Sequence, residues 1–228
     1  MRKKVWKPLV SKFEEKFADR YLSILQRKGI ISSSEYNKEK FIQVREKIRE
    51  TFSCSKKSSI RPEEERLLYA IGEIVKPQSI IGVGSYFGYG ISWIIAGMDP
   101  NGKAYLIDPD QEVSKLAQSN FEKLGLGQKI NIINADFFDS VNQLPKTDLV
   151  WIDASGPRDS TILDHRFKKI YGPIIESIDS HVINEGIVIA HNVLPLSNKT
   201  GRFKQYIKQN YSSNCIIPSG CGVCVTKK

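Results

Sequence analysis

A glycine-rich turn between an apolar strand pattern and an apolar helix pattern is the segment of this sequence best suited to chemistry. Residues 80–90 read IIGVGSYFGYG. Glycines let the backbone turn sharply and approach a ligand without an intervening Cβ, and the start of the next helix offers unpaired N–H groups. The turn therefore predicts a seat for a nucleoside cofactor, with Gly82, Gly84, Ser85 and Gly88 at the contact.

An acidic residue at the end of the next strand pattern supports this interpretation. Asp108 follows the apolar run Ala104–Ile107, and a spacing of roughly twenty residues from the turn is what one βαβ step takes. A carboxylate at that edge of a parallel sheet can accept both hydroxyls of a ribose. A dinucleotide site prefers Gly-x-Gly-x-x-Gly, whereas Phe87 stands directly before Gly88 here. An NAD-dependent oxidoreductase is therefore an alternative rather than the leading interpretation.

Three more strand-like segments are followed by polar residues that can do chemistry, namely Asp136, Asp153 and His191. The loops after successive parallel strands collect on one edge of a sheet, because the crossover connections are right-handed. Together with Asp108, these side chains should therefore meet in a single cleft.

From Ile60 to its C-terminus the sequence resembles the class I S-adenosylmethionine-dependent methyltransferases, and within them the catechol and caffeoyl-CoA type O-methyltransferases. The matching segments follow the family's order: RPEEERLL at 61–68, GSYFGY at 84–89, LIDPD at 106–110, NAD at 134–136, DLVWIDA at 148–154, GIVIAHNVL at 186–194 and IPSGCGVCV at 217–225. Several segments in the right order are far more specific than any one of them. The resemblance implies methyl transfer from S-adenosylmethionine to a hydroxyl of a small molecule.

The resemblance also implies cofactor roles for Gly84, Asp108 and Asp136. The glycine turn would hold the methionine portion, Asp108 the ribose, and Asp136 the adenine amino group, with Phe137 packing near the ring. Asp136 has a simpler alternative as a helix cap or turn residue.

On the acceptor side this chain departs from the family it resembles. The family holds a divalent cation with an Asp after the fourth strand and an Asp-Asn pair after the fifth, so that the metal gathers and acidifies adjacent hydroxyls. The corresponding residues here are Asp153 and the pair His191-Asn192. Imidazole shifts the preference from Mg²⁺ toward Mn, Fe, Co or Zn, and the Lys that the family carries shortly after its first Asp is missing from residues 154–159.

Two acceptor-side mechanisms therefore stay open. In one, Asp153, His191 and Asn192 hold a metal; in the other, His191 acts as a metal-free base with Asp153 beside it. Both predict a loss of rate below the ordinary His pKa of about 6.5. A structural role for His191 is the remaining interpretation.

Helix and strand patterns alternate in the part of the chain that carries these residues. A helix stripe of Leu67, Leu68, Ile71 and Ile74 is followed by strand-like segments at Ile80–Val83, Ala104–Ile107, Ile130–Ile133, Leu149–Ile152 and Ile187–Ala190. Such alternation is typical of a parallel sheet covered by helices on both faces. With the resemblance, it predicts a Rossmann-like α/β fold: a seven-stranded, mostly parallel sheet that ends in an antiparallel C-terminal hairpin.

Two helices should precede this domain. One apolar stripe runs from Phe13 through Leu25 and should end near Gly29, and a second, Phe41, Val44 and Ile48, should be capped by Ser32–Ser34. The polar segment 53–59 marks a boundary between a helical extension, residues 1–59, and the methyltransferase domain, residues 60–228. In the resembled family, such helices cover the substrate entrance or join a homodimer interface.

Positive charge is concentrated in the first segment. Residues 1–61 contain 17 Lys and Arg against 7 Asp and Glu, whereas the rest of the chain has 17 against 18. Basic segments attract polyanions through counterion release, although a solvated helical surface explains the same charge. If the segment recruits RNA, the protein is a tRNA methyltransferase instead of a small-molecule enzyme. A third possible function, given the departures on the acceptor side, is a cofactor-binding protein that has lost catalysis.

Length and composition limit the classes of protein to which this chain can belong. A chain of 228 residues buries one good core. No apolar run approaches the roughly 18 residues of a membrane span, and the first residues lack the apolar region of a signal peptide. Four cysteines do not suggest a disulfide scaffold. The expectation is a soluble, cytoplasmic protein.

Overall fold

The computed structural model describes residues 7–52, 60–194 and 198–228. The helices are α1 (Lys7–Arg27), α2 (Lys38–Thr51), α3 (Pro62–Val75), α4 (Tyr89–Gly97), α5 (Gln111–Lys123), α6 (Phe137–Ser140), α7 (Tyr171–Ile178) and α8 (Gly201–Asn210). The strands are β1 (Ser79–Val83), β2 (Lys103–Ile107), β3 (Ile130–Ile133), β4 (Thr147–Ile152), β5 (Val182–His191), β6 (Ser213–Ile217) and β7 (Val223–Lys227). Short 3₁₀ turns lie between these elements, at Gly127–Lys129, Val141–Gln143, Leu163–His165, Lys168–Ile170, Asp179–His181 and Asn198–Thr200.

The described strands form one sheet in the order β3-β2-β1-β4-β5-β7-β6. Strands β1 to β5 pair in parallel, and β7 runs antiparallel to both β5 and β6. The expected seven-stranded α/β fold with an antiparallel C-terminal hairpin is confirmed. All five parallel strands end at the same edge, and the chain order reverses between β1 and β4, where ligands of open α/β sheets bind.

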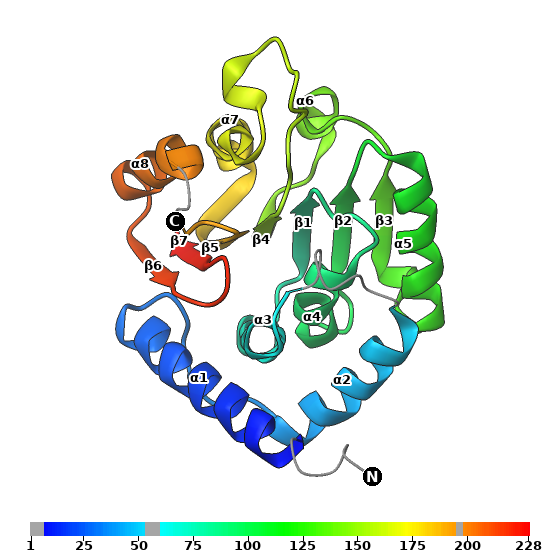
Figure 1. Cartoon of the computed structure of the whole chain (residues 1–228), viewed down its shortest axis with the longest axis vertical. Coiled ribbons are helices and arrows are strands. Elements are labelled where there is room, and N and C mark those ends of the chain that lie inside the picture. Colours follow the sequence, from blue (N-terminus) through cyan, green and yellow to red (C-terminus); the bar gives the residue numbers. More distant parts are fainter. Residues whose placement is uncertain (1–6, 53–59, 195–197) are drawn as a thin grey trace.

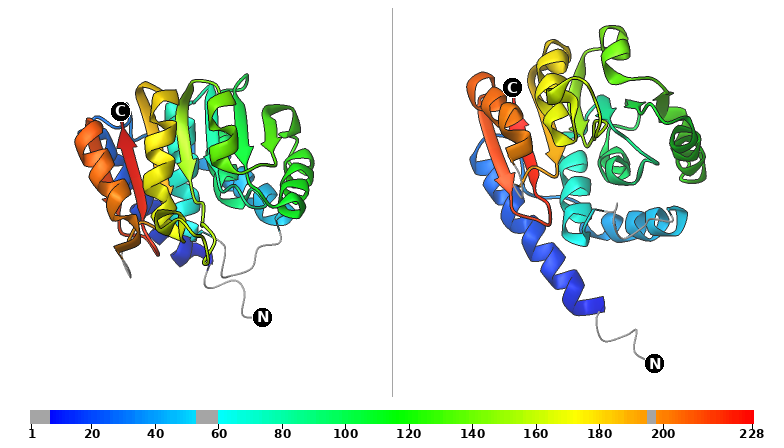
Figure 2. Two further views of the ribbon diagram at one scale, coloured as in Figure 1. Left: turned by 90° about the horizontal axis from the view of Figure 1, so that it is seen from above. Right: turned by 45° about the horizontal axis from the view of Figure 1, so that its top comes forward.

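Both faces of the sheet are buried, as its β-branched strands require. Along β4, Leu149 and Trp151 point into one apolar cluster, while Val150 and Ile152 point into the other. Helices α1 to α4 cover the first face, with α3 and α4 against the sheet and α1 and α2 outside them (Figure 1). Helices α7 and α8 lie side by side on the second face (Figure 2).

The two N-terminal helices are present, with two differences from the sequence prediction. Phe13 is 60% exposed rather than part of the core. Helix α2 is capped by Asn37, whose Oδ1 accepts from the N–H of Lys40 at 2.8 Å, and not by the serines at 32–34. Gly29 follows the end of α1 with φ +69°, as expected of a helix terminus.

The proposed boundary, residues 53–59, lies outside the described residues, so the division at residue 59 stays a prediction. The buried residues of α1 and α2 belong to the same apolar cluster as those of α3 and α4. None of the helices in the described ranges combines the length and the apolar composition that crossing a membrane requires.

Candidate active site

A cavity of about 710 Å³ lies at the carboxyl ends of the parallel strands. It brings together most of the residues predicted from the sequence, since its lining includes Gly84, Ser85, Asp108, Asp136, Phe137, Asp153, His191 and Asn192. Gly82 and Gly88 are not among the lining residues. The convergence follows from the topology, because each of these side chains comes from the end of a parallel strand or the loop after it.

The glycines of the turn are required mainly by packing within the protein. Gly84 has φ +74°, and a Cβ there would collide with the backbone of Ala154. A Cβ on Gly82 would meet Ile91 and Leu106, and Gly88, with φ +92°, lies against the ring of Phe121. The turn is therefore close-packed beneath the cavity, and Gly84 with Ser85 forms the part that faces it.

Asp108, directly after β2, is buried and oriented by the turn. Its Oδ2 accepts from the N–H of Tyr86 at 2.8 Å, and its Oδ1 accepts from the N–H of Asp110 at 3.1 Å. Burial raises the pKa of Asp108, while these two N–H groups partly offset the effect. Tyr86 adopts φ +48°, a strained conformation for a non-glycine residue that aims its N–H at the carboxylate.

Asp136 caps a helix and also lines the cavity, while its contact with adenine stays a prediction. It is the N-cap of α6, with Oδ1 accepting from the N–H of Phe138 at 2.9 Å, and it also lines the cavity beside Phe137. Because one carboxylate oxygen makes the cap, Asp136 keeps a fixed orientation toward the cavity.

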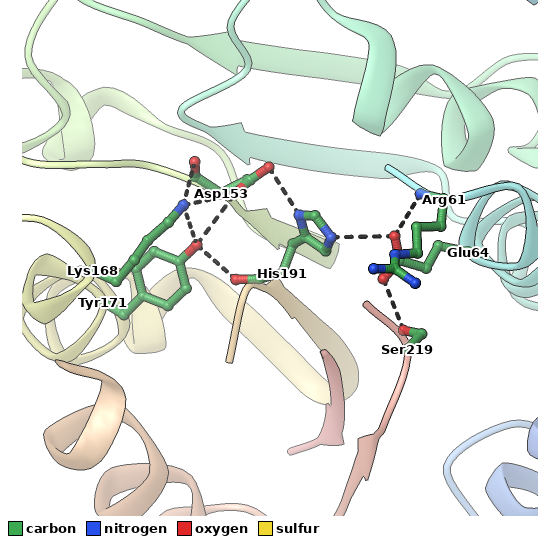
Figure 3. Close-up of polar contacts among 7 residues, drawn as sticks. All are labelled: Arg61, Glu64, Asp153, Lys168, Tyr171, His191 and Ser219. Atoms are coloured by element: carbon green, nitrogen blue, oxygen red, sulfur yellow. Dashed lines mark hydrogen bonds and ion pairs between the residues drawn. The ribbon is translucent and has the colours of Figure 1, made fainter. Parts of the chain in front are cut away.

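His191 is the last residue of β5 and lies between two carboxylates (Figure 3). Its Nδ1 is 3.3 Å from Oδ2 of Asp153, and its Nε2 is 3.4 Å from Oε2 of Glu64. The ring stacks on Trp151 and is 7% exposed. Although burial alone lowers the pKa of His191, attraction to Asp153 and hydrogen bonds to both carboxylates raise it to about 10. The imidazole is therefore charged near neutral pH.

Asp153, directly after β4, binds a lysine as well as His191. Its Oδ1 lies 2.7 Å from Nζ of Lys168, which also contacts the hydroxyl of Tyr171 at 3.0 Å. Burial opposes ionisation of Asp153, but Lys168 and His191 lower its pKa to about 2. Tyr171 donates its hydroxyl to the carbonyl oxygen of His191 at 2.8 Å and so connects the two strand ends (Figure 3).

Sequence reasoning missed Glu64 and Lys168. Glu64 is 1% exposed, and its carboxylate accepts from the N–H of Arg61 at 2.7 Å and from the hydroxyl of Ser219 at 2.8 Å. The sequence feature that could have indicated Glu64 is its place in the first turn of a helix that carries an apolar stripe. Lys168, farther along the chain than 154–159, places an ammonium beside Asp153, and no local sequence pattern marks it for that contact.

The residues present do not fit the divalent metal that the resemblance implies. Lys168 and His191 engage both oxygens of Asp153. In the described part of the chain, no group of three or more His, Cys, Asp or Glu side chains is arranged to hold a metal ion. A divalent cation would also lie beside the ammonium of Lys168, which repels it.

Fold and site together define a class I methyltransferase, with a glycine turn and an acidic strand end beside a cavity at the switch point of the sheet. A family profile described as O-methyltransferase matches residues 31–224, and the chain belongs to this family. The catechol O-methyltransferase of Niastella koreensis is 22% identical over 171 residues, which are 72% of this chain and 77% of that protein.

Solved structures of low sequence identity share the fold. The O-methyltransferase from Bacillus cereus in complex with SAH superposes with a TM-score of 0.63 at 16% identity, covering 94% of this chain and 100% of that one. The O-methyltransferase TomG from Streptomyces achromogenes, involved in tomaymycin synthesis and solved with SAM, gives a TM-score of 0.61 at 13% identity, with 94% and 97% covered.

Proposed function

We propose that this chain transfers a methyl group from S-adenosylmethionine to a hydroxyl of a small molecule. The observation that carries the proposal is a single cavity that contains both a cofactor side, with Gly84 and Asp108, and a polar acceptor side, with Asp153 and His191. Membership of the O-methyltransferase family and the SAM and SAH complexes of similar structures support it.

On the cofactor side, the backbone at Gly84 and Ser85 would hold the methionine portion, and Asp108 would accept the ribose hydroxyls. Asp136 would accept from the adenine amino group, with Phe137 against the ring. When bound, the cofactor supplies a methyl group on a positively charged sulfur. After the transfer, this sulfur is part of a neutral thioether.

On the acceptor side, the protein has to align the hydroxyl with the methyl group and help it lose a proton. A charged His191 facing the acceptor would lower the pKa of the hydroxyl by electrostatic attraction. Asp153 and Glu64 would hold the imidazole in place, and the proton of the hydroxyl would pass to water. His191 as a neutral base, one of the two mechanisms left open by the sequence, requires the imidazole to lose its proton first. The homodimer expected from the resemblance stays a prediction.

A methyl-transfer screen with labelled cofactor tests the function directly. Phenols, catechols, sugars and bulk tRNA would serve as acceptors, each with and without a chelator. Labelling of a small hydroxyl compound is the expected result. Labelled tRNA, together with tRNA binding that weakens steeply with salt, would instead support a nucleic-acid substrate.

Cofactor binding has its own test in Asp108→Ala. This change removes charge-assisted hydrogen bonds worth roughly 1.5–3 kcal/mol, so the affinity for S-adenosylmethionine should fall about ten- to a hundredfold in calorimetry. Glu112→Ala, in the first turn of α5 and paired only with Lys115 among the described contacts, is the matched control. Unchanged affinity in Asp108→Ala, or tight NAD binding by the native chain, would contradict the assignment.

A further inference from the structure

The ammonium of Lys168 is held by three oxygens at the base of the acceptor side. Its Nζ lies 2.7 Å from Oδ1 of Asp153, 3.2 Å from the carbonyl oxygen of the same residue and 3.0 Å from the hydroxyl of Tyr171. An ammonium has three N–H donors, so these contacts use its full capacity. Tyr171 can accept from Lys168 because its own proton goes to the carbonyl of His191.

The loop that carries Lys168 is folded back so that this contact forms. Gly156 and Phe167 pair as an isolated antiparallel bridge, with N–H···O distances of 3.0 and 3.1 Å in the two directions. Lys168 follows immediately and begins the 3₁₀ turn that leads into α7, where Tyr171 is the first residue. With a side chain only 21% exposed, Lys168 is held against Asp153 rather than extended into solvent.

The charges around Asp153 are already balanced by nitrogen groups. Two carboxylates, Asp153 and Glu64, face the ammonium of Lys168 and the imidazole of His191 (Figure 3). A divalent ion prefers several oxygen ligands, and here it would have to displace Lys168 or His191 to reach the oxygens of Asp153.

We infer that the ammonium of Lys168 takes the place of a divalent metal beside Asp153, so that methyl transfer by this chain needs no metal ion. Lys168 is a positioning residue in this arrangement: it fixes Asp153, and through Asp153 it fixes His191, which faces the acceptor. The catalytic part of the inference rests on the proposed function, whereas the exclusion of metal does not.

Titration with Mn²⁺, followed by the electron paramagnetic resonance signal of the free ion, tests the exclusion without an acceptor. The native chain, with and without S-adenosylmethionine, should bind Mn²⁺ no more tightly than Asp153→Asn does. Lys168→Met removes the ammonium and frees one oxygen of Asp153, so Mn²⁺ affinity should rise by at least about tenfold. Lys168→Gln provides the same measurement should Lys168→Met fail to fold.

Two control variants test whether the positive charge and the position of Lys168 are what keep Mn²⁺ from binding. Lys168→Arg keeps the positive charge and should bind as little Mn²⁺ as the native chain. Lys169→Met removes an exposed lysine from the neighbouring position and should behave likewise. A native chain that binds one equivalent of Mn²⁺, lost in Asp153→Asn, would overturn the inference. The inference would also be overturned if Lys168→Met or Lys168→Gln folds and binds Mn²⁺ no more tightly than the native chain.

Activity provides the second readout once an acceptor is known. A chelator should leave the rate of the native chain unchanged, and a rate that disappears with chelator and returns with added metal would overturn the inference. If no acceptor is ever labelled, the proposed function fails, yet the Mn²⁺ titration still decides the question of the metal.

Discussion

His191 is held between two carboxylates, and this environment decides which proton transfers it can take part in. The sequence alone suggests an ordinary imidazole that loses its charge near pH 6.5. The structure places Asp153 and Glu64 against its two ring nitrogens, and the pKa is raised to about 10. Below that pH the ring is an imidazolium, which can polarise a hydroxyl but cannot accept its proton.

The pH dependence of turnover therefore distinguishes the two roles of His191. An imidazolium that polarises the acceptor predicts a rate with no loss near pH 6.5 and a fall above about pH 10, as His191 loses its proton. A neutral base predicts the opposite, a rate that rises toward pH 10. His191→Gln should lower the rate by about 10²–10⁴-fold and remove either pH limb, with cofactor affinity unchanged in calorimetry. Near-native turnover by this variant would show that His191 is structural.

Lys168 should influence which hydroxyl compounds are methylated. A metal held by the site would gather two adjacent hydroxyls, whereas an imidazolium whose two nitrogens face Asp153 and Glu64 acts on the acceptor through its charge and needs no second hydroxyl. A phenol with a single hydroxyl should then be methylated with a kcat/KM within about tenfold of the matching catechol, the difference being at most one hydrogen bond. Initial rates for such a pair of acceptors check this expectation. A catechol preferred by several orders of magnitude would contradict it.

At the scale of elements, the loop from Ala154 to Ile170 lines part of the cavity and carries Lys168 to Asp153. Gly156 pairs with Phe167, and a Cβ at Gly156 would collide with the carbonyl of His165. Gly156→Ala should therefore displace the loop, cost about 1–3 kcal/mol of unfolding free energy and lower turnover through Lys168. Denaturant unfolding and rate measurements check both effects. Gly201→Ala, at the start of α8 with open space around it, is the control and should be neutral or slightly stabilising.

The same loop shows where prediction from sequence ends. Strand-end residues such as Asp108 and Asp153 were predictable because parallel pairing and right-handed crossovers force them to one edge of the sheet. Lys168 reaches Asp153 only through the bridge between Gly156 and Phe167, which has no periodicity to reveal it. Glu64 meets His191 because α3 packs across the sheet, a tertiary contact between residues far apart in the chain.

For the molecule as a whole, the buried residues of the N-terminal helices lie in one apolar cluster with those of the helices that cover the sheet. Leu22 and Leu25 of α1 are fully buried with residues of α3 and α4. Part of the positive charge of this segment is also neutralised locally: Lys38 pairs with Glu15 and Asp19 at 2.9 and 2.8 Å, and Arg45 pairs with Glu14 at 2.8 Å. Charge counting from the sequence could not reveal these pairs, because they join different helices.

A point substitution in α1 tests whether the helix is integral to the methyltransferase core. Leu22→Ala leaves a cavity beneath a fully buried position and should cost about 2–5 kcal/mol, a large share of the roughly 5–15 kcal/mol of a typical domain. Phe13→Ala, at a 60% exposed position of the same helix, should change the unfolding free energy by no more than about 0.5 kcal/mol. Urea unfolding followed by circular dichroism and by tryptophan fluorescence measures both, since Trp93 and Trp151 are buried in the core that α1 joins. One shared transition, shifted to lower urea by Leu22→Ala, is the expected result. If Leu22→Ala leaves the urea midpoint of the tryptophan fluorescence transition unchanged, residues 1–59 would instead be a separate unit.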